Sequence, residues 1–159
     1  MKLTKVGQFP SLAGLSLPDI DKYNPILTVE ERGDFGRAVG LHAHSVGIGS
    51  FVYFRRIFEG LIEKTHTKLL STAEWHEDAL VRSRMDEKIK LLSSALLYVV
   101  VENSDMYSML SKGIHELSEQ ECFRYFDILR AGIEMILGEE LADLEKSKQG
   151  DILSKAISF

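Results

Sequence analysis

One stretch constrains the fold of this chain more than any other: residues 50–70, SFVYFRRIFEGLIEKTHTKLL. Its large apolar residues recur at steps of three and four, the spacing that places side chains on one face of an α-helix. They are Phe51, Phe54, Phe58, Leu61 and Ile62. Val52 and Ile57 widen this apolar stripe. We therefore expect the helix to lie centrally in a bundle of helices.

Capping signals and apolar spacing predict helices in the rest of the chain. Thr28 with Glu31, and Ser118 with Glu121, form capping boxes at two helix starts. Gly47 and Gly49 indicate a break, or a place where two helices approach closely. The expected helices cover residues 28–45, 50–70, 82–97, 106–114 and 118–137, with a short helix or structured loop at 72–77 and a last docking helix in 152–159.

The run Leu96–Val101 is β-branched and aromatic enough to form a strand, but a single strand has no partner. We interpret it as a buried helix end or a tight loop. The predicted fold class is therefore all-α, with a bundle of about five to six helices over residues 28–159.

Residues 1–27 contain all three prolines, which remove backbone donors and disfavour helix in the residue before them. This segment is predicted to be an extended N-terminal arm that packs on the core. The side chains expected to make the contact are Phe9, Leu12, Leu15 and Leu17. Such an arm also suggests the hypothesis that the chain is the C-terminal part of a longer protein.

Composition excludes several classes of protein. Residues 1–70 carry nine Lys and Arg against seven Asp and Glu, and residues 71–159 carry ten against seventeen, so a chain-wide basic surface for nucleic acid is absent. Cys122 is the only cysteine, which excludes an internal disulfide and a cysteine-rich zinc site. His42 and His44 are two residues apart and cannot share a metal on a helix. No stretch is apolar for about 18 residues. We expect a cytoplasmic protein that has no metal or cofactor and does not enter a membrane.

Two interpretations are open for Arg55, Arg56 and Glu59, which lie within one helical turn. They form either a solvated ion pair on the outer face or a partly buried polar site. A second polar group surrounds the predicted helix 106–114: Asn103, Ser111, His115 and Glu116. These residues either cap the helix ends or face the arginines across the bundle. In the buried alternative His115 lies close to Glu59, and truncation of Glu59 costs about 3 kcal/mol.

The chain contains an arm, then a helix with RRIFEGLIE, and then the segment ENSDMYSMLSKGIHELSEQEC before a long last helix. Over residues 28–144 this succession resembles the HEPN superfamily. The similarity is to a branch of uncharacterised bacterial domains with an R-x-x-x-E helix and a later N…G-x-H segment. HEPN proteins are small α-helical bundles, often dimeric, and many belong to prokaryotic defence or toxin systems. The resemblance implies a homodimer of this kind.

Catalytic HEPN ribonucleases carry an Arg and a His separated by four to six residues. His115 stands at a comparable place, but residues 108–110 supply no arginine. Arg37 with His42 satisfies the spacing, as does Arg37 with His44, but in the first helix and without the usual polar residue after the arginine. The resemblance therefore implies a non-catalytic member.

Three functions follow as alternatives. The first is a non-catalytic sensing or interaction module that binds RNA, a nucleotide or a partner protein at a defined polar site, made of Arg55, Arg56, Glu59, Asn103 and His115. The second is a metal-independent ribonuclease that uses His115, or Arg37 with His42. The third is a structural dimerisation domain in which these polar residues only fix the register of the helices. A surplus of large apolar residues favours dimerisation in all three: Phe51, Phe54, Phe58, Phe123, Tyr125 and Phe126.

Overall fold

The computed structural model describes residues 9, 14, 18–70, 82–94, 96 and 98–157, and within them all regular structure is helical. The predicted all-α fold class is confirmed. The elements are η1 (Pro18–Tyr23), α2 (Val29–Ala43), α3 (Gly47–Leu70), α5 (Met85–Leu91), α6 (Tyr98–Glu102), α7 (Asp105–His115) and α8 (Glu119–Ile157).

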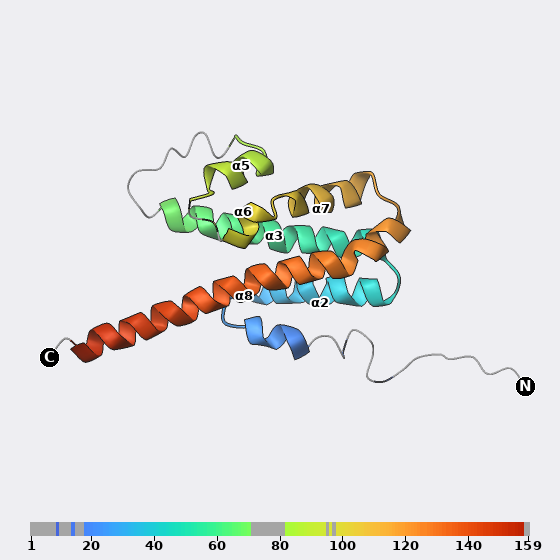
Figure 1. The fold of residues 1–159 in the computed structure, drawn as a ribbon. Helices are drawn as coiled ribbons and strands as arrows, with labels where there is room; N and C mark the ends of the chain where they lie inside the picture. The colour runs from blue at the N-terminus through green and yellow to red at the C-terminus, as the bar shows by residue number, and fades with distance from the viewer. Residues whose placement is uncertain are drawn as a thin grey trace, which may run out of the picture.

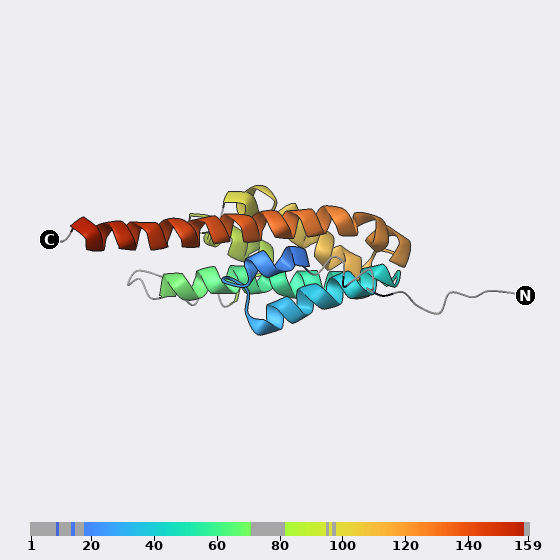
Figure 2. The ribbon, with the colours of Figure 1, turned by 90° about the horizontal axis from the view of Figure 1, so that it is seen from below.

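Three long helices, α2, α3 and α8, lie side by side (Figures 1 and 2). Helix α3 is central, because it packs against α2, α8 and α7. The short helices α5, α6 and α7 lie along the side of α3 away from α2 (Figure 1). The core between them is almost entirely apolar, and the α3 stripe stands at its centre as the spacing predicts. Its fully buried members are Phe51, Phe54, Ile57, Phe58 and Ile62.

Both predicted capping boxes form. The Thr28 hydroxyl accepts a hydrogen bond from the Glu31 amide, and the Glu31 carboxylate accepts one from the Thr28 amide. Ser118 and Glu121 repeat this arrangement at the start of α8. Gly47 is the first residue of α3. It also lies where α3 and α8 approach closely, because a Cβ there would lie 2.6 Å from the backbone oxygen of Glu119. Both halves of the glycine prediction are thus confirmed.

The N-terminal arm differs from its prediction. Phe9 is fully exposed, so its predicted contact with the core is wrong. Residues 12, 15 and 17 lie outside the described residues. The end of the segment is not extended, since Pro18–Tyr23 forms the 3-10 helix η1. Ile20 and Tyr23 are buried there, and the Tyr23 hydroxyl donates a hydrogen bond to the backbone oxygen of Glu134.

The middle of the chain is more broken than the sequence predicts. The helix expected over residues 82–97 is the shorter α5, which ends in turns after Leu91. The segment that could have been a strand is not the end of the preceding helix: it has a bend at Leu96 and the start of the separate short helix α6, with Leu96 and Val100 buried and Tyr98 exposed. The prediction for residues 72–77 lies outside the described residues.

The C-terminal prediction is wrong. Instead of a separate docking helix, α8 continues unbroken through Gly138 and Gly150 to Ile157. Its last residues extend beyond the rest of the bundle (Figures 1 and 2), and Ile152, Leu153 and Ile157 are exposed. A glycine costs a helix about 1 kcal/mol, which the helix-forming residues around Gly138 can offset.

Candidate functional site

Arg55 and Glu59 of α3 form a polar contact with Tyr107 of α7. Arg55 Nε lies 2.8 Å from Glu59 Oε1, and Arg55 Nη2 lies 3.1 Å from the Tyr107 hydroxyl. The same hydroxyl donates to Glu59 Oε1 over 3.1 Å. The Arg55 and Glu59 side chains are 28% and 34% exposed, so this contact is partly buried rather than fully solvated. The hydrogen bond that Arg55 donates to Glu59 raises the pKa of Arg55, and burial raises the pKa of Tyr107.

Arg56 points to the other side of α3 and pairs with α2. Its Nη2 atom lies 2.6 Å from Glu30 Oε1, and its Nε atom lies 3.3 Å from Asp34 Oδ2. Asp34 is buried and also pairs with Arg37 over 2.9 Å. The adjacent arginines therefore belong to two separate interhelical contacts, and both guanidinium groups face carboxylates.

Asn103 and His115 are both exposed, Asn103 between α6 and α7 and His115 at the end of α7. His115 is eight residues past Tyr107, or about 12 Å along the helix axis. The expectation that His115 lies close to Glu59 is therefore wrong, and Tyr107 takes that place. Tyr107, Leu110 and Ile114 share the helical spacing that could have identified the inward face of α7.

Arg37 and His42 also lie apart. Five residues on an α-helix correspond to a rotation of about 140°, so the two side chains leave α2 on different faces. Arg37 pairs with Asp34, whereas His42 stacks on rings from α8. His44 is the exposed C-cap of α2. The geometry does not bring Arg37 and His42 together in the way the ribonuclease alternative needs.

His42 has an unusual environment. Its ring stacks on Phe126 at 3.8 Å between centroids, with 7° between the planes, and on Phe123 at 4.3 Å and 19°. The Nδ1 atom is buried and has no hydrogen-bond partner among the residues that the structure describes. Burial lowers the pKa of this imidazole, opposed by Asp127 and assisted by Arg130. The aromatic partners of His42 come from more than 80 residues further along, so no local signal around His42 predicts this stack.

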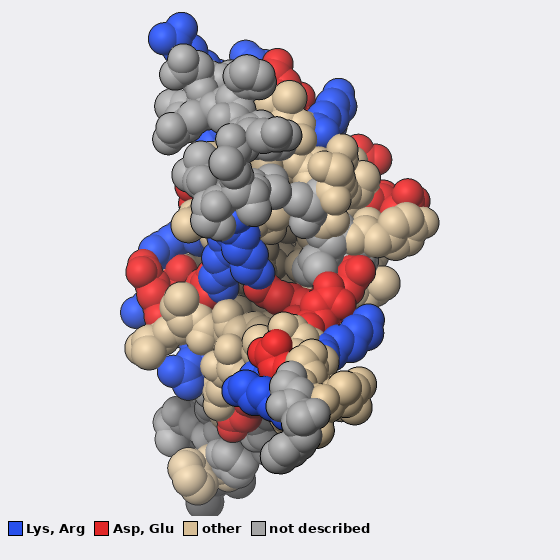
Figure 3. Space-filling view, turned by 90° about the vertical axis from the view of Figure 1, so that its left-hand side faces the viewer, with Lys and Arg blue, Asp and Glu red and all other residues tan. Residues whose placement is uncertain are grey.

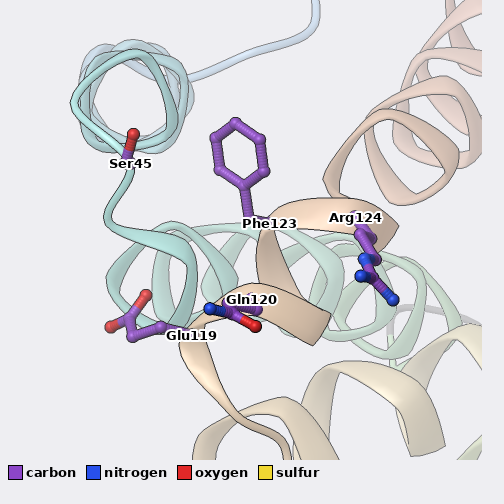
Figure 4. A pocket seen from close by; sticks show the side chains of 5 residues that line it. All are labelled: Ser45, Glu119, Gln120, Phe123 and Arg124. Carbon is purple, nitrogen blue, oxygen red and sulfur yellow. The ribbon is translucent and has the colours of Figure 1, made fainter.

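A pocket of about 270 Å³ lies next to this stack, where the turn after α2 meets the start of α8 (Figure 4). Ser45, Glu119, Gln120, Phe123 and Arg124 line it. The Glu119 carboxylate accepts hydrogen bonds from the Gly47 and Ile48 amides, which caps α3 and fixes this corner. A second pocket, of about 350 Å³, lies between α7 and α8; it is lined by Asp105, Ser108, Met109, Lys112, Leu117 and Tyr125.

The remaining surface gives no strong signal for one kind of ligand. Acidic and basic side chains are interspersed over the described part of the face in Figure 3. Among the described residues, no three His, Cys, Asp or Glu side chains are grouped so that they could hold a metal ion. No helix of the described chain has both the length and the apolar character to cross a membrane. No family model, curated protein or solved structure matches this chain.

Proposed function

We propose that this chain is a non-catalytic interaction module that acts as a homodimer, with the outer face of α8 packed antiparallel against the same face of a second copy. The single observation that carries the proposal is the unpartnered face of α8. Ile128 and Met135 are 63% and 61% exposed there, and the helix then continues beyond the bundle with Ile152, Leu153 and Ile157 exposed.

The spacing of this face suits helix pairing. Ile128, Met135 and Ala142 are seven residues apart, and Ala131 and Gly138 stand between them at the second position of the same heptads. The small residues allow a second helix to approach, and a Cβ at Gly138 would meet nothing within 4 Å. With 39 residues, α8 is about 58 Å long. A free helical end of this kind gains stability from packing rather than from propensity.

Charge selects the antiparallel direction and a second copy as the partner. Residues 119–144 carry seven Asp and Glu against two Arg, whereas residues 145–157 carry three Lys against two Asp and Glu. A parallel pair would align the two acidic segments, which is unfavourable. The antiparallel pair places the acidic segment of each copy beside the more basic segment of the other.

The polar site predicted from the sequence supports the structural role better than ligand binding. Arg55 pairs with Glu59 on the same helix, and Arg56 pairs with Glu30 and Asp34 of α2, so the charge of each arginine is already compensated within the chain. The aromatic argument for a dimer changes as well. Phe51, Phe54, Phe58 and Phe126 are buried in the chain's own core, and only Phe123 and Tyr125 stay partly exposed. The dimer that the HEPN resemblance implies is thus proposed on α8 alone.

Sedimentation equilibrium tests the dimer. We expect a mass twice the 17.9 kDa of the chain, and a single species of 17.9 kDa for Met135→Lys. Tyr98→Lys is the matched control, because Tyr98 is 71% exposed but lies on α6. A wild-type chain that stays at 17.9 kDa up to about 100 μM, well above the dissociation constant of a stable dimer, would contradict the proposal.

Cysteine crosslinking tests the direction. In an antiparallel pair only positions near the middle of the paired region meet their own copies, so Ala142→Cys should form a disulfide-linked dimer and Ala131→Cys should not. A parallel pair would crosslink at both positions. Cys122 is buried and serves as the background in each variant.

A further inference from the structure

Four aromatic rings form a continuous stack from the core to the surface at the contact between α2, α3 and α8. Phe54 stacks on Phe126 at 5.0 Å between centroids, Phe126 on His42 at 3.8 Å, and His42 on Phe123 at 4.3 Å. The first two rings are buried, and Phe123 is 42% exposed. The stack therefore begins in the core and ends at the pocket lined by Phe123.

His42 lies between the two α8 rings. A ring stacked nearly face to face at 3.8 Å covers one side of the imidazole, so the second ring must lie on the other side. Phe123 consequently has one face against His42. Its exposed area therefore belongs to the opposite face and the edge, and Phe123 is one of the residues that line the pocket drawn in Figure 4.

The pocket has the size and chemistry for one ring system. Its volume of about 270 Å³ is just below the range of about 300–1,000 Å³ that holds drug-sized ligands. The Gln120 amide can both donate and accept hydrogen bonds, and the Ser45 hydroxyl can do the same. These groups suit a ring with nitrogen or oxygen atoms at its edge.

Charge around the pocket argues against a phosphorylated ligand. Arg124 is the one basic side chain among the lining residues. Glu119 lines the same pocket, and Glu121 and Asp127 lie on the same two turns of α8. A phosphate group would meet this acidic surrounding, whereas a neutral ring would not.

We propose that the pocket formed by Ser45, Glu119, Gln120, Phe123 and Arg124 binds a small, neutral, planar heteroaromatic molecule. Its ring stacks on the exposed face of Phe123 and extends the series of rings, and its edge atoms form hydrogen bonds with Gln120 and Ser45. Purine nucleosides and indole compounds share this chemistry. This site lies on the first two turns of α8, whereas the proposed dimer pairs the helix from Ile128 onward.

Saturation-transfer NMR titrations with adenosine, N-acetyltryptophanamide and adenosine monophosphate test the site. We expect saturable binding of at least one of the two neutral compounds, and their relative affinity identifies the source of the ring. Adenosine monophosphate should bind more weakly than adenosine. Failure of both neutral compounds to bind at about 10 mM would overturn the proposal, as would a nucleotide that binds as tightly as its nucleoside.

Variants locate the binding on the stack. Phe123→Ala should weaken binding about tenfold, because stacking on an aromatic side chain contributes on that order, and Phe123→Trp should retain it. Gln120→Ala leaves the rings intact and should weaken binding about fivefold. Tyr125→Ala is the matched control on the same helix, since Tyr125 lines the other pocket. Equal binding by Phe123→Ala, Gln120→Ala and the control would show that the ligand binds elsewhere.

Discussion

The two parts of α8 have similar helical backbones and opposite surroundings. Residues 122–137 place six side chains in the core, all buried: Cys122, Phe126, Leu129, Ile133, Ile136 and Leu137. Residues 145–157 bury none, although Ile152, Leu153 and Ile157 are as apolar as the residues before them. The adjacent residues Arg55 and Arg56 differ in a similar way, because the Arg55 side chain is less exposed than the Arg56 side chain.

Covering by another helix, rather than residue type, therefore decides how much a side chain contributes to the stability of the fold. Removal of apolar area from water stabilises the folded state by about 25 cal/mol per Å², and an exposed Leu153 contributes almost none of it to the single chain. The predictions below test this difference between covered and uncovered positions.

The largest effect is expected for Phe126→Ala. Phe126 is buried and stacks on both His42 and Phe54, so its truncation should lower the free energy of unfolding by about 3–5 kcal/mol. Leu153→Ala, in the uncovered part of the same helix, should stay within about 0.5 kcal/mol in monomeric protein. Urea denaturation measures both. Equal losses would mean that the end of α8 packs on the bundle in solution.

Glycines offer the next contrast. A Cβ at Gly113 would lie 2.0 Å from Cδ2 of the buried Phe51, so Gly113→Ala should cost about 1–3 kcal/mol through overpacking. Gly138 has open space around the same position, and Gly138→Ala should stabilise α8 by up to about 1 kcal/mol. Thermal denaturation followed by circular dichroism should therefore show midpoint shifts of opposite sign. A shift in the same direction for both would contradict the packing at Gly113.

Glu59→Ala should cost about 1–2 kcal/mol, less than the roughly 3 kcal/mol of a fully buried pair, because Arg55 and Glu59 remain partly exposed. The variant leaves Arg55 and the Tyr107 hydroxyl without their shared acceptor. Glu30→Ala is the control, since Glu30 pairs with Arg56 at a largely exposed position, and it should cost no more than about 0.5 kcal/mol. An unchanged denaturation midpoint in Glu59→Ala would show that this contact does not stabilise the fold.

The smallest effect concerns pH. Burial holds the pKa of His42 below its ordinary value of 6.5 in the folded chain, so the unfolded chain binds the proton more readily. Stability should therefore fall as the pH decreases through about 6.5, and His42→Phe should reduce this dependence. Urea midpoints at a series of pH values measure it, with His115→Gln as the control that keeps His42. A pH profile that is the same in wild type and His42→Phe would contradict the lowered pKa of His42.

Local physical chemistry in the sequence was sufficient to predict much of the fold. The apolar spacing of residues 50–70 predicted the central helix, and the capping boxes at Thr28 and Ser118 predicted the starts of α2 and α8. Each of these signals acts within a few residues, so the sequence displays it directly.

The candidate site was predicted only in part. The coupling of Glu59 with Arg55 is confirmed because both residues lie on one turn of α3. Its partner Tyr107 and the ring stack around His42 depend on how α7 and α8 pack on α3 and α2. No spacing within one helix contains that information.

The sequence by itself therefore determined that the chain is all-α, where its best-capped helices begin and which face of α3 is buried. Only the tertiary structure decided that α8 continues past Gly138 without docking, that Arg55 and Arg56 serve different interfaces, and that Phe123 ends a stack of rings at a pocket. The physical reason is range: caps and periodicity act over one or two turns, whereas burial and pairing depend on which helices meet across the bundle.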